Sequence, residues 1–280
     1  MSVSAPQIQF RNETIAAFEV GQSLLRDTVT TEAVLKGNQA TFLVAGTGGA
    51  EAVTRGVNGR IPARQNNNVQ NTATLVEWHD KVEETGFNIF ASQGNQRAIM
   101  QDGVVKVMNR RVDKDIITLL NTATVNTGAA AAADLPMVLT AKTKLQNAEI
   151  PWDNMITGLI TPAFDSYLES IPAYSSADYV DIKPNEDPNA WSDKPKARRW
   201  KGVNWIVHPN LPGVGTNAEK CFLYHGSALG HAMNTTGMDT AIGYDDADDF
   251  SYARATCYMG GTLLQNTGIV VMNHDGSAYA

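Results

Sequence analysis

The sequence predicts an α+β fold dominated by one long helix and one long β-excursion. Residues 95–124 carry apolar side chains at steps of three and four, which places them on one face of a helix. Residues 37–78 hold two strand-like runs separated by 26 residues, far more than a hairpin loop usually takes. Further helical and strand-like segments follow, so we expect a mixed architecture of helices and sheets.

The first segment, 1–36, is expected to form an N-terminal arm and a helix. Residues 1–9 are polar, and Asn12 is suited to cap a helix that continues to about Arg26. The opening residues lack the charged and apolar regions of a signal peptide, so none is expected.

The segment 37–78 is predicted to be an extended β-hairpin loop. Its strands are expected at 41–45 and 72–78, with Gly37-Asn38 as a preceding turn. At about 3.3 Å per residue, each arm reaches up to about 70 Å, which suits contact with a neighbouring molecule. A disordered surface loop is the alternative. The loop has a basic tip, opposed by a single glutamate, that consists of Arg55, Arg60 and Arg64.

The segment 79–136 is centred on the helix predicted at 95–124. Thirty residues at about 1.5 Å each make a rod of roughly 45 Å, against which several elements can pack. The expected apolar face comprises Val105, Met108, Val112, Ile116, Leu119 and Ala123. The expected polar sides carry Lys106, Asn109, Arg110, Asp113 and Lys114.

The segment 137–240 alternates between helical and strand-like patterns. We expect a helix over 137–148 that ends before Pro151, a buried strand over 155–161, and a second helix that begins at Pro162. Further predicted elements are an exposed loop (181–202), a strand (203–209), and a strand that turns into a short helix (221–233).

The segment 241–280 is expected to return to the sheet beside the long helix. Two strands are predicted around Gly260-Gly261, with a turn at 266–268. Before them, residues 239–249 hold five aspartates and no lysine or arginine. These are Asp239, Asp245, Asp246, Asp248 and Asp249.

Composition limits the classes of function. Charged residues make up 18% of the chain, against roughly a quarter in typical soluble proteins, a low value that suits surfaces covered by neighbours. A net charge of −7 disfavours a sequence-reading nucleic-acid binder but allows nucleic acid to be enclosed. Two cysteines without ligand spacing indicate a reducing compartment, and no apolar run is long enough to span a membrane.

Enzymatic chemistry finds little support. His225 and His231 are six residues apart, with Cys221 nearby, which is not the spacing of a helical zinc pair. The GTGG run at 46–49 lacks the lysine and helix of a phosphate loop. The acidic run 245–249 lacks the EF-hand pattern, so a solvated loop is preferred over a calcium site. We therefore expect no catalytic residue, metal or cofactor.

Five stretches together resemble a known family. They are AAFEVGQSLLRDTVTTEAVLKGNQATFLVAGTGGAEA, KLQNAEIPWDNMITGLITPAFDSYL, WKGVNWIVHPNLPG, FLYHGSALGHAM and GGTLLQNTGIVVM. In this order they are similar to segments of the major capsid protein of tailed bacteriophages, the Hong Kong 97-like fold. Each motif is loose, but the likeness covers nearly the whole chain.

The resemblance implies a structural shell subunit rather than an enzyme. It implies an N-terminal arm, an extended loop at 37–78, a peripheral domain with a spine helix at 95–124, and a mixed α/β axial domain at 137–240. Copies would form pentamers and hexamers of an icosahedral virion head, assembled in the host cytoplasm around double-stranded DNA that is not read by sequence.

The resemblance also implies partner proteins. Little of the sequence precedes the arm, so a separate scaffolding protein is expected, together with a portal and a possible decoration protein. No lysine lies between Lys36 and Lys81, so the loop is not expected to form a lysine cross-link. We expect the basic tip (Arg55, Arg60, Arg64) to meet acidic surface on an adjacent subunit, with Asp245–Asp249 as one candidate.

Two other functions are kept as alternatives. An encapsulin-like nanocompartment shares the fold but would require a groove for a cargo peptide. A cytosolic metal- or nucleotide-dependent enzyme would depend on residues such as His225.

Overall fold

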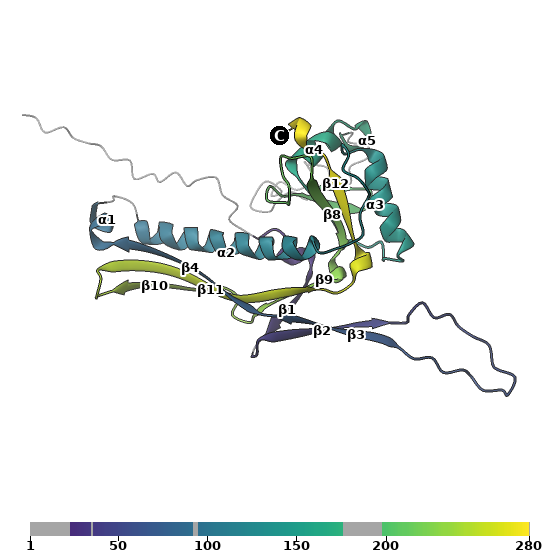
Figure 1. Cartoon of the computed structure of the whole chain (residues 1–280). Helices are drawn as coiled ribbons and strands as arrows, with labels where there is room; N and C mark the ends of the chain where they lie inside the picture. The colour runs from purple at the N-terminus through teal and green to yellow at the C-terminus, as the bar shows by residue number, and fades with distance from the viewer. Residues whose placement is uncertain (1–22, 35, 92–94, 176–197, 280) are drawn as a thin grey trace, which may run out of the picture.

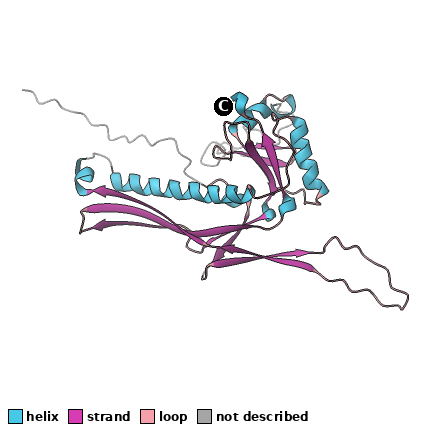
Figure 2. Cartoon of the chain, viewed as in Figure 1, coloured by secondary structure: helices cyan, strands magenta, loops and turns pink. Residues whose placement is uncertain are grey.

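The structure is a computed structural model that describes residues 23–34, 36–91, 95–175 and 198–279. Its strands form two five-stranded sheets and a separate two-stranded hairpin. Figure 1 shows the longest helix lying along the first sheet, a compact body around the second sheet, and the hairpin projecting away from both. Most of the shorter helices lie on the compact body (Figure 2). The chain therefore combines a mixed helix-and-sheet core with one long appendage.

Helix α2 (Gln96–Leu120) is the longest described helix. The side chain of Asn95 caps it by accepting a backbone N–H of the first turn at 3.3 Å. Its 25 residues span about 37 Å. The predicted helix, 95–124, begins one residue too early and ends four residues too late. The N–H of Ala123 bonds to the carbonyl three residues earlier, which tightens the end of the helix.

The buried face of α2 follows the predicted period closely. Met108, Val112 and Ile116 are buried as expected, whereas Val105 and Leu119 are half-buried at the margins. The prediction for one polar residue is wrong, because Asp113 lies in the interior rather than on a polar side. The complete buried set is Met100, Val104, Met108, Val112, Asp113, Ile116, Ile117 and Leu120.

The first sheet is organised around one long central strand, β11 (Phe250–Leu263). Strand β4 (Val76–Thr85) runs antiparallel along one side of it. The other neighbours are β10 (Asp239–Asp245) and β9 (Leu229–Asn234), which pair with successive parts of β11. Strand β1 (Thr30–Val34) adds to β9 in parallel. Residues 239–249, predicted as a loop, therefore form an edge strand and a turn.

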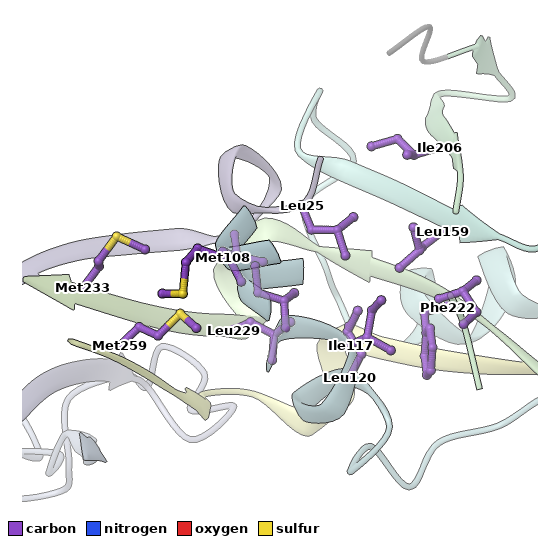
Figure 3. Packing of buried hydrophobic residues seen from close by; sticks show 14 of the residues in the cluster. Leu25, Met108, Ile117, Leu120, Leu159, Ile206, Phe222, Leu229, Met233 and Met259 are labelled. Atoms are coloured by element: carbon purple, nitrogen blue, oxygen red, sulfur yellow. The ribbon is translucent and has the colours of Figure 1, made fainter. Parts of the chain in front are cut away.

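Small side chains let α2 approach this sheet closely. Alternate residues of β11 face the helix and are buried: Ser251, Ala253, Ala255, Cys257 and Met259. Methionines from the helix and two strands fill the remaining space (Figure 3). At Gly261 a Cβ would lie 2.2 Å from the Leu119 side chain, and at Gly260 it would lie 2.1 Å from the Thr74 carbonyl. The predicted Gly-Gly irregularity is thus a point of close contact within a continuous strand.

The hairpin consists of β2 (Gln39–Gly46) and β3 (Asn67–Thr74), paired antiparallel along their full length. The prediction of a strand at 41–45 is confirmed. The run predicted as one strand at 72–78 is divided between β3 and β4, with Leu75 between them.

A small apolar cluster fixes the base of the hairpin. Phe42 packs so closely on Gly230 that a Cβ there would lie 2.9 Å from its ring. Ala40, Ala73 and Ala232 complete the buried cluster. The hairpin is therefore anchored at its base, while its far end extends into solvent (Figure 1).

The second sheet has the order β12-β8-β5-β7-β6. Its central strand β5 (Ile156–Ile160) is buried at all five positions, as expected for the predicted buried strand. The other strands are β6 (Arg198–Trp200), β7 (Val203–Val207), β8 (Glu219–His225) and β12 (Ile269–His274). Residues 241–280, predicted as one return segment, therefore contribute strands to both sheets.

Short helices accompany the second sheet. Helix α3 (Leu135–Asn147) starts two residues before the predicted 137–148 and buries the predicted Val138, Ala141 and Leu145. Helix α4 (Pro162–Glu169) begins at the predicted proline, with the Thr161 hydroxyl as its cap. Elsewhere in the described residues, the helical turns are α1 (Gly86–Ala91), α5 (Pro172–Ser175), η1 (Arg26–Thr28), η3 (Gly226–Ala228), η4 (Asn266–Gly268) and η5 (Ser277–Tyr279).

Two further predictions differ from the structure. The short helix expected within 221–233 is one 3₁₀ turn between β8 and β9. The helix expected from Asn12 to Arg26 falls mostly outside the described residues, and its end is the 3₁₀ turn η1. Most of the predicted loop 181–202 also lies outside the described residues, and its end includes β6.

Candidate functional site

The loop between β2 and β3, residues 47–66, is exposed along its whole length. A tight turn closes its tip, where the Gly56 N–H donates to the Arg60 carbonyl at 3.0 Å. The Arg55 guanidinium donates to the Gly59 carbonyl at 3.1 Å. Within the described residues, no aspartate or glutamate forms an ion pair with Arg55, Arg60 or Arg64. The positive charge of the basic tip is therefore exposed to solvent and is not neutralised by an acidic side chain of the described residues.

The same loop also exposes large apolar side chains. Val53 is 63% exposed, Ile61 is 70% exposed, and Val57 at the tip is fully exposed. Burying one such side chain is worth about 1.5–3 kcal/mol. Several of them on a projecting loop indicate a surface that another protein chain covers.

The acidic residues lie in the turn between β10 and β11. The Asp245 carboxylate accepts the Ala247 N–H at 3.0 Å, and Tyr244 donates its hydroxyl to Asp249. This hydrogen bond raises the pKa of Tyr244, with the nearby aspartates adding to the effect. Asp246 and Asp248 are exposed in the same turn. The turn is thus solvated, and its backbone conformation is held by its own side chains.

The basic tip and the acidic turn lie at opposite ends of the molecule. Figure 1 shows the loop beyond β2 and β3 at one end, and the β10–β11 turn beside α1 at the other. The structure therefore does not bring them together within one subunit. A contact between them requires two copies of the chain.

The residues considered for metal or phosphate chemistry are dispersed. His225 contacts Ser227 and the Asp153 carboxylate. Cys221 is fully buried, and the burial raises its pKa to about 12. No group of three or more His, Cys, Asp or Glu residues suited to a metal ion occurs among the described residues. The GTGG run begins with the last residue of β2, Gly46, and continues as a turn with Gly48 and Gly49 at positive φ.

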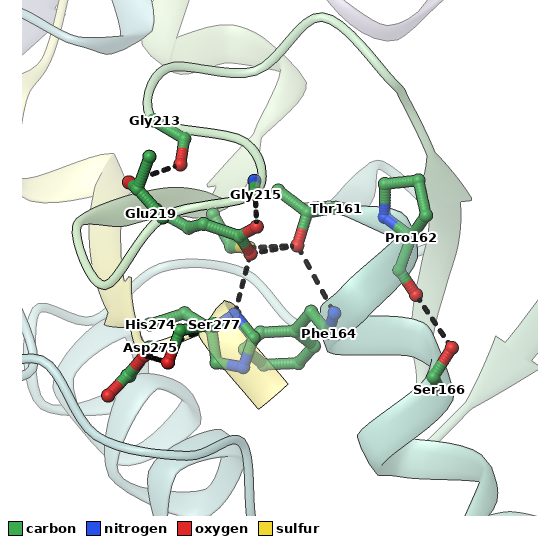
Figure 4. Close-up of polar contacts among 12 residues, drawn as sticks. Thr161, Pro162, Phe164, Ser166, Gly213, Gly215, Glu219, His274, Asp275 and Ser277 are labelled. Atoms are coloured by element: carbon green, nitrogen blue, oxygen red, sulfur yellow. Dashed lines mark hydrogen bonds and ion pairs between the residues drawn. The ribbon is translucent and has the colours of Figure 1, made fainter. Parts of the chain in front are cut away.

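A buried carboxylate, which the sequence analysis missed, organises one side of the compact body (Figure 4). Glu219 is fully buried and accepts hydrogen bonds from the Gly215 N–H at 2.7 Å and the Thr161 hydroxyl at 2.5 Å. His274 Nδ1 lies 2.7 Å from the same carboxylate. These contacts join the start of α4, the loop before β8 and the end of β12. Nothing in the local sequence distinguishes Glu219 from a surface residue.

A second buried carboxylate fixes the N-terminal end of the described chain. Asp113 on α2 accepts the Ser23 hydroxyl at 2.6 Å and the N–H groups of Leu24 and Leu25 at 3.1 and 3.2 Å. His208 Nε2 lies 3.5 Å from it. Because the partners are about 90 residues apart in sequence, helical periodicity alone could not show that this aspartate is buried.

A third polar pair lies between α2 and the first sheet. His231 on β9 is buried, and neither ring nitrogen has a hydrogen-bond partner among the described residues. Burial, with a smaller effect of Arg26, lowers the pKa of His231 to about 4. Its Nε2 lies 3.8 Å from Asp115, whose pKa burial raises. Both shifts favour the uncharged forms.

One protein-family model matches almost the whole chain. This model, described as "Phage capsid protein", matches residues 4–275. The chain belongs to the phage capsid protein family. It is a structural major capsid protein that forms the shell of the virion head. This finding supports the predicted capsid function over the encapsulin-like and enzymatic alternatives.

Solved structures show the same fold over nearly the same length. A protein of Mycobacterium phage Che8 matches with a TM-score of 0.70 and 17% identity, covering 97% of this chain and 98% of that chain. The capsid of Ralstonia phage GP4 matches with a TM-score of 0.70 and 12% identity, covering 98% of each. The capsid of a native GTA particle matches with a TM-score of 0.67 and 14% identity, covering 98% of this chain and 96% of that chain. No curated protein sequence matches the chain.

These comparisons confirm the Hong Kong 97-like capsid fold that the sequence predicts. Within this fold, α2 lies along the first sheet, and β2 and β3 form the projecting hairpin (Figure 1). No helix of the described residues is long and apolar enough to cross a membrane.

Proposed function

We propose that this capsid protein assembles as pentamers and hexamers into an icosahedral shell in which the loop 47–66 lies on a neighbouring subunit. The supporting observation is the projecting hairpin, whose apolar side chains are exposed in the single chain. Permanent interfaces are large and apolar, and closed shells repeat them by symmetry. A neighbour would supply the cover that the loop lacks in its own subunit.

The segments have distinct roles in this proposal. Residues 79–136 form the peripheral domain around α2, and residues 137–240 form the axial domain, which packs around the five- and six-fold centres. Residues 241–280 connect the two, because β10 and β11 pair beside α2 while β12 pairs with β8. The N-terminal segment 1–36 acts as an arm.

The shell encloses double-stranded DNA without reading its sequence. A subunit with a net charge of −7 has little net electrostatic attraction for DNA phosphates. The shell therefore encloses the packaged DNA without binding it tightly. The protein has no enzymatic activity in this proposal and needs no cofactor. Assembly takes place in the host cytoplasm, with the virion as the final location.

Other proteins complete the assembly. We infer a separate scaffolding protein, a portal and a possible decoration protein. The loop has no lysine between Lys36 and Lys81, so the shell is held by non-covalent contacts at this point rather than by a lysine cross-link.

The basic tip contributes electrostatic contacts to these interfaces. Arg55, Arg60 and Arg64 meet acidic surface on an adjacent subunit, and Asp245–Asp249 is the candidate with the highest density of carboxylates. Each exposed ion pair is worth about 0–1 kcal/mol, but a shell repeats it many times. Replacing all three arginines by alanine should weaken assembly and reduce its salt sensitivity. Unchanged assembly and salt sensitivity would contradict this contact.

Electron microscopy tests the proposed function. The chain, expressed with a scaffolding protein, should form closed shells with five- and six-fold clusters of subunits. A monodisperse monomer under all such conditions would contradict it.

A further inference from the structure

Helix α1 exposes two large aromatic side chains. Phe87 is 74% exposed and Phe90 is 88% exposed, whereas phenylalanine is usually buried. The helix has six residues and lies at the end of β4, far from the compact body (Figure 1). Water around two adjacent phenyl rings is unfavourable, so the pair is suited to contact with another apolar surface.

The start of α1 is attached to the acidic turn. The Gly86 N–H donates to the Asp249 carbonyl at 3.1 Å. A Cβ at Gly86 would lie 2.7 Å from the Asp249 carboxylate, which shows how closely the two segments pack. Tyr244, which is 51% exposed, donates its hydroxyl to the same carboxylate. Aromatic and acidic side chains therefore share one end of the molecule, here named the distal end.

The loop 47–66 has the complementary chemistry. Fully exposed Val57 lies at its tip between Arg55 and Arg60, so an apolar group is flanked by two cations. The loop carries three arginines and one glutamate, whereas residues 239–249 carry five aspartates without a basic residue. The loop and the distal end lie at opposite ends of one subunit (Figure 1), so a subunit cannot satisfy its own distal end.

We propose that the distal end is the receptor for the loop 47–66 of a second copy of the chain. Val57 packs against Phe87 and Phe90, while the flanking arginines face the carboxylates of the acidic turn. This inference rests on the proposed function and names the partner surface of the loop. Arginine next to a phenyl ring adds a cation–π contribution, which reinforces the same arrangement.

Disulfide trapping tests the contact. The double variant Val57→Cys/Phe90→Cys places one thiol on the loop and one on the receptor. The native Cys221 and Cys257 are 0% and 1% exposed, so they do not compete. In assembled particles under mild oxidation, the variant should give a ladder of covalent oligomers on a non-reducing gel. The matched control is Val57→Cys/Leu139→Cys, because Leu139 is exposed at 42% on α3 of the compact body.

The outcomes separate this inference from the proposed function. Particles in which the test variant forms no more covalent oligomers than the control would overturn the receptor assignment while leaving the shell function intact. If the double variant does not assemble, single Val57→Cys and Phe90→Cys chains are co-assembled with an excess of unmodified chain, and the same comparison of dimers decides. Failure of the unmodified chain to form shells would instead contradict the proposed function.

Discussion

The second sheet buries its apolar side chains, whereas the loop of the projecting hairpin exposes apolar side chains to solvent. All five residues of β5 are buried, and the polar atoms of Glu219 beside it are hydrogen-bonded within the chain. In the hairpin loop, Val57 and Ile61 are exposed. The compact body therefore buries its apolar side chains within its own chain, whereas the loop leaves apolar surface uncovered in the single subunit.

The largest effect is expected from the buried carboxylate. Glu219→Ala removes the acceptor of the Gly215 and Thr161 donors and leaves His274 without its partner. Breaking a buried pair in this way costs about 3–5 kcal/mol. Denaturant unfolding of the free subunit measures it. Glu51→Ala in the exposed loop is the control and should change stability by less than about 0.5 kcal/mol; equal losses would contradict the contrast between the regions.

A pH effect is expected at His231. Burial lowers its pKa from the ordinary 6.5 to about 4 in the folded chain, so the unfolded chain binds the proton first as the pH falls. The contribution to stability is complete above pH 6.5 and is lost toward pH 4, by roughly 3 kcal/mol in total.

The variant His231→Leu should flatten this part of the stability profile, measured by chemical unfolding from pH 7 to pH 4. His79→Gln on β4, where the ring is half exposed, should keep the acid loss. A profile for His231→Leu that matches the unmodified chain would contradict the role of His231.

Overpacking the second sheet is expected to have a smaller effect. At Gly158 a Cβ would lie 2.5 Å from the Trp205 ring, so Gly158→Ala forces a shift that costs about 1–3 kcal/mol. Gly103 in α2 is the matched control, since its Cβ would meet nothing within 4 Å. Gly103→Ala should stabilise the helix by up to about 1 kcal/mol. Thermal unfolding that places both variants on the same side of the unmodified chain would refute this account.

The smallest effect on folding is expected in the loop. Val57→Ser should change the unfolding free energy of the free subunit by less than about 0.5 kcal/mol, because this side chain is already fully exposed. The same change should raise the subunit concentration needed for assembly, as measured by light scattering. A marked loss of subunit stability without an effect on assembly would contradict the claim that Val57 contributes to contacts between subunits and not to folding.

The sequence predicts those helices and strands whose formation depends on residues close together in the chain. The apolar period of α2, the proline start of α4 and the buried run of β5 follow from adjacent residues. The buried state of Asp113 and Glu219 could not be predicted, because their side-chain partners Ser23, Thr161 and His274 lie about 55–90 residues away in sequence. Strand β10 was also missed, because five aspartates suggested a loop while its pairing with β11 depends on tertiary contacts.

The exposed surfaces were predicted in part. The clustered arginines and aspartates in the sequence identified the basic tip and the acidic turn, and both segments are exposed in the structure. The aromatic pair of α1 was missed, because Phe87 and Phe90 in a short apolar run look like core residues. Their exposure depends on α1 lying beyond the end of the sheet.

Limited proteolysis with trypsin tests the central claim most directly, because the loop supplies its own cleavage sites at Arg55, Arg60 and Arg64. In the free subunit, the exposed loop should be cut rapidly at these sites. In assembled shells of the same chain, a neighbour covers the loop, and cleavage there should slow at least tenfold relative to the free subunit. Equal rates of loop cleavage in the two forms would contradict the claim that a neighbouring subunit covers the loop.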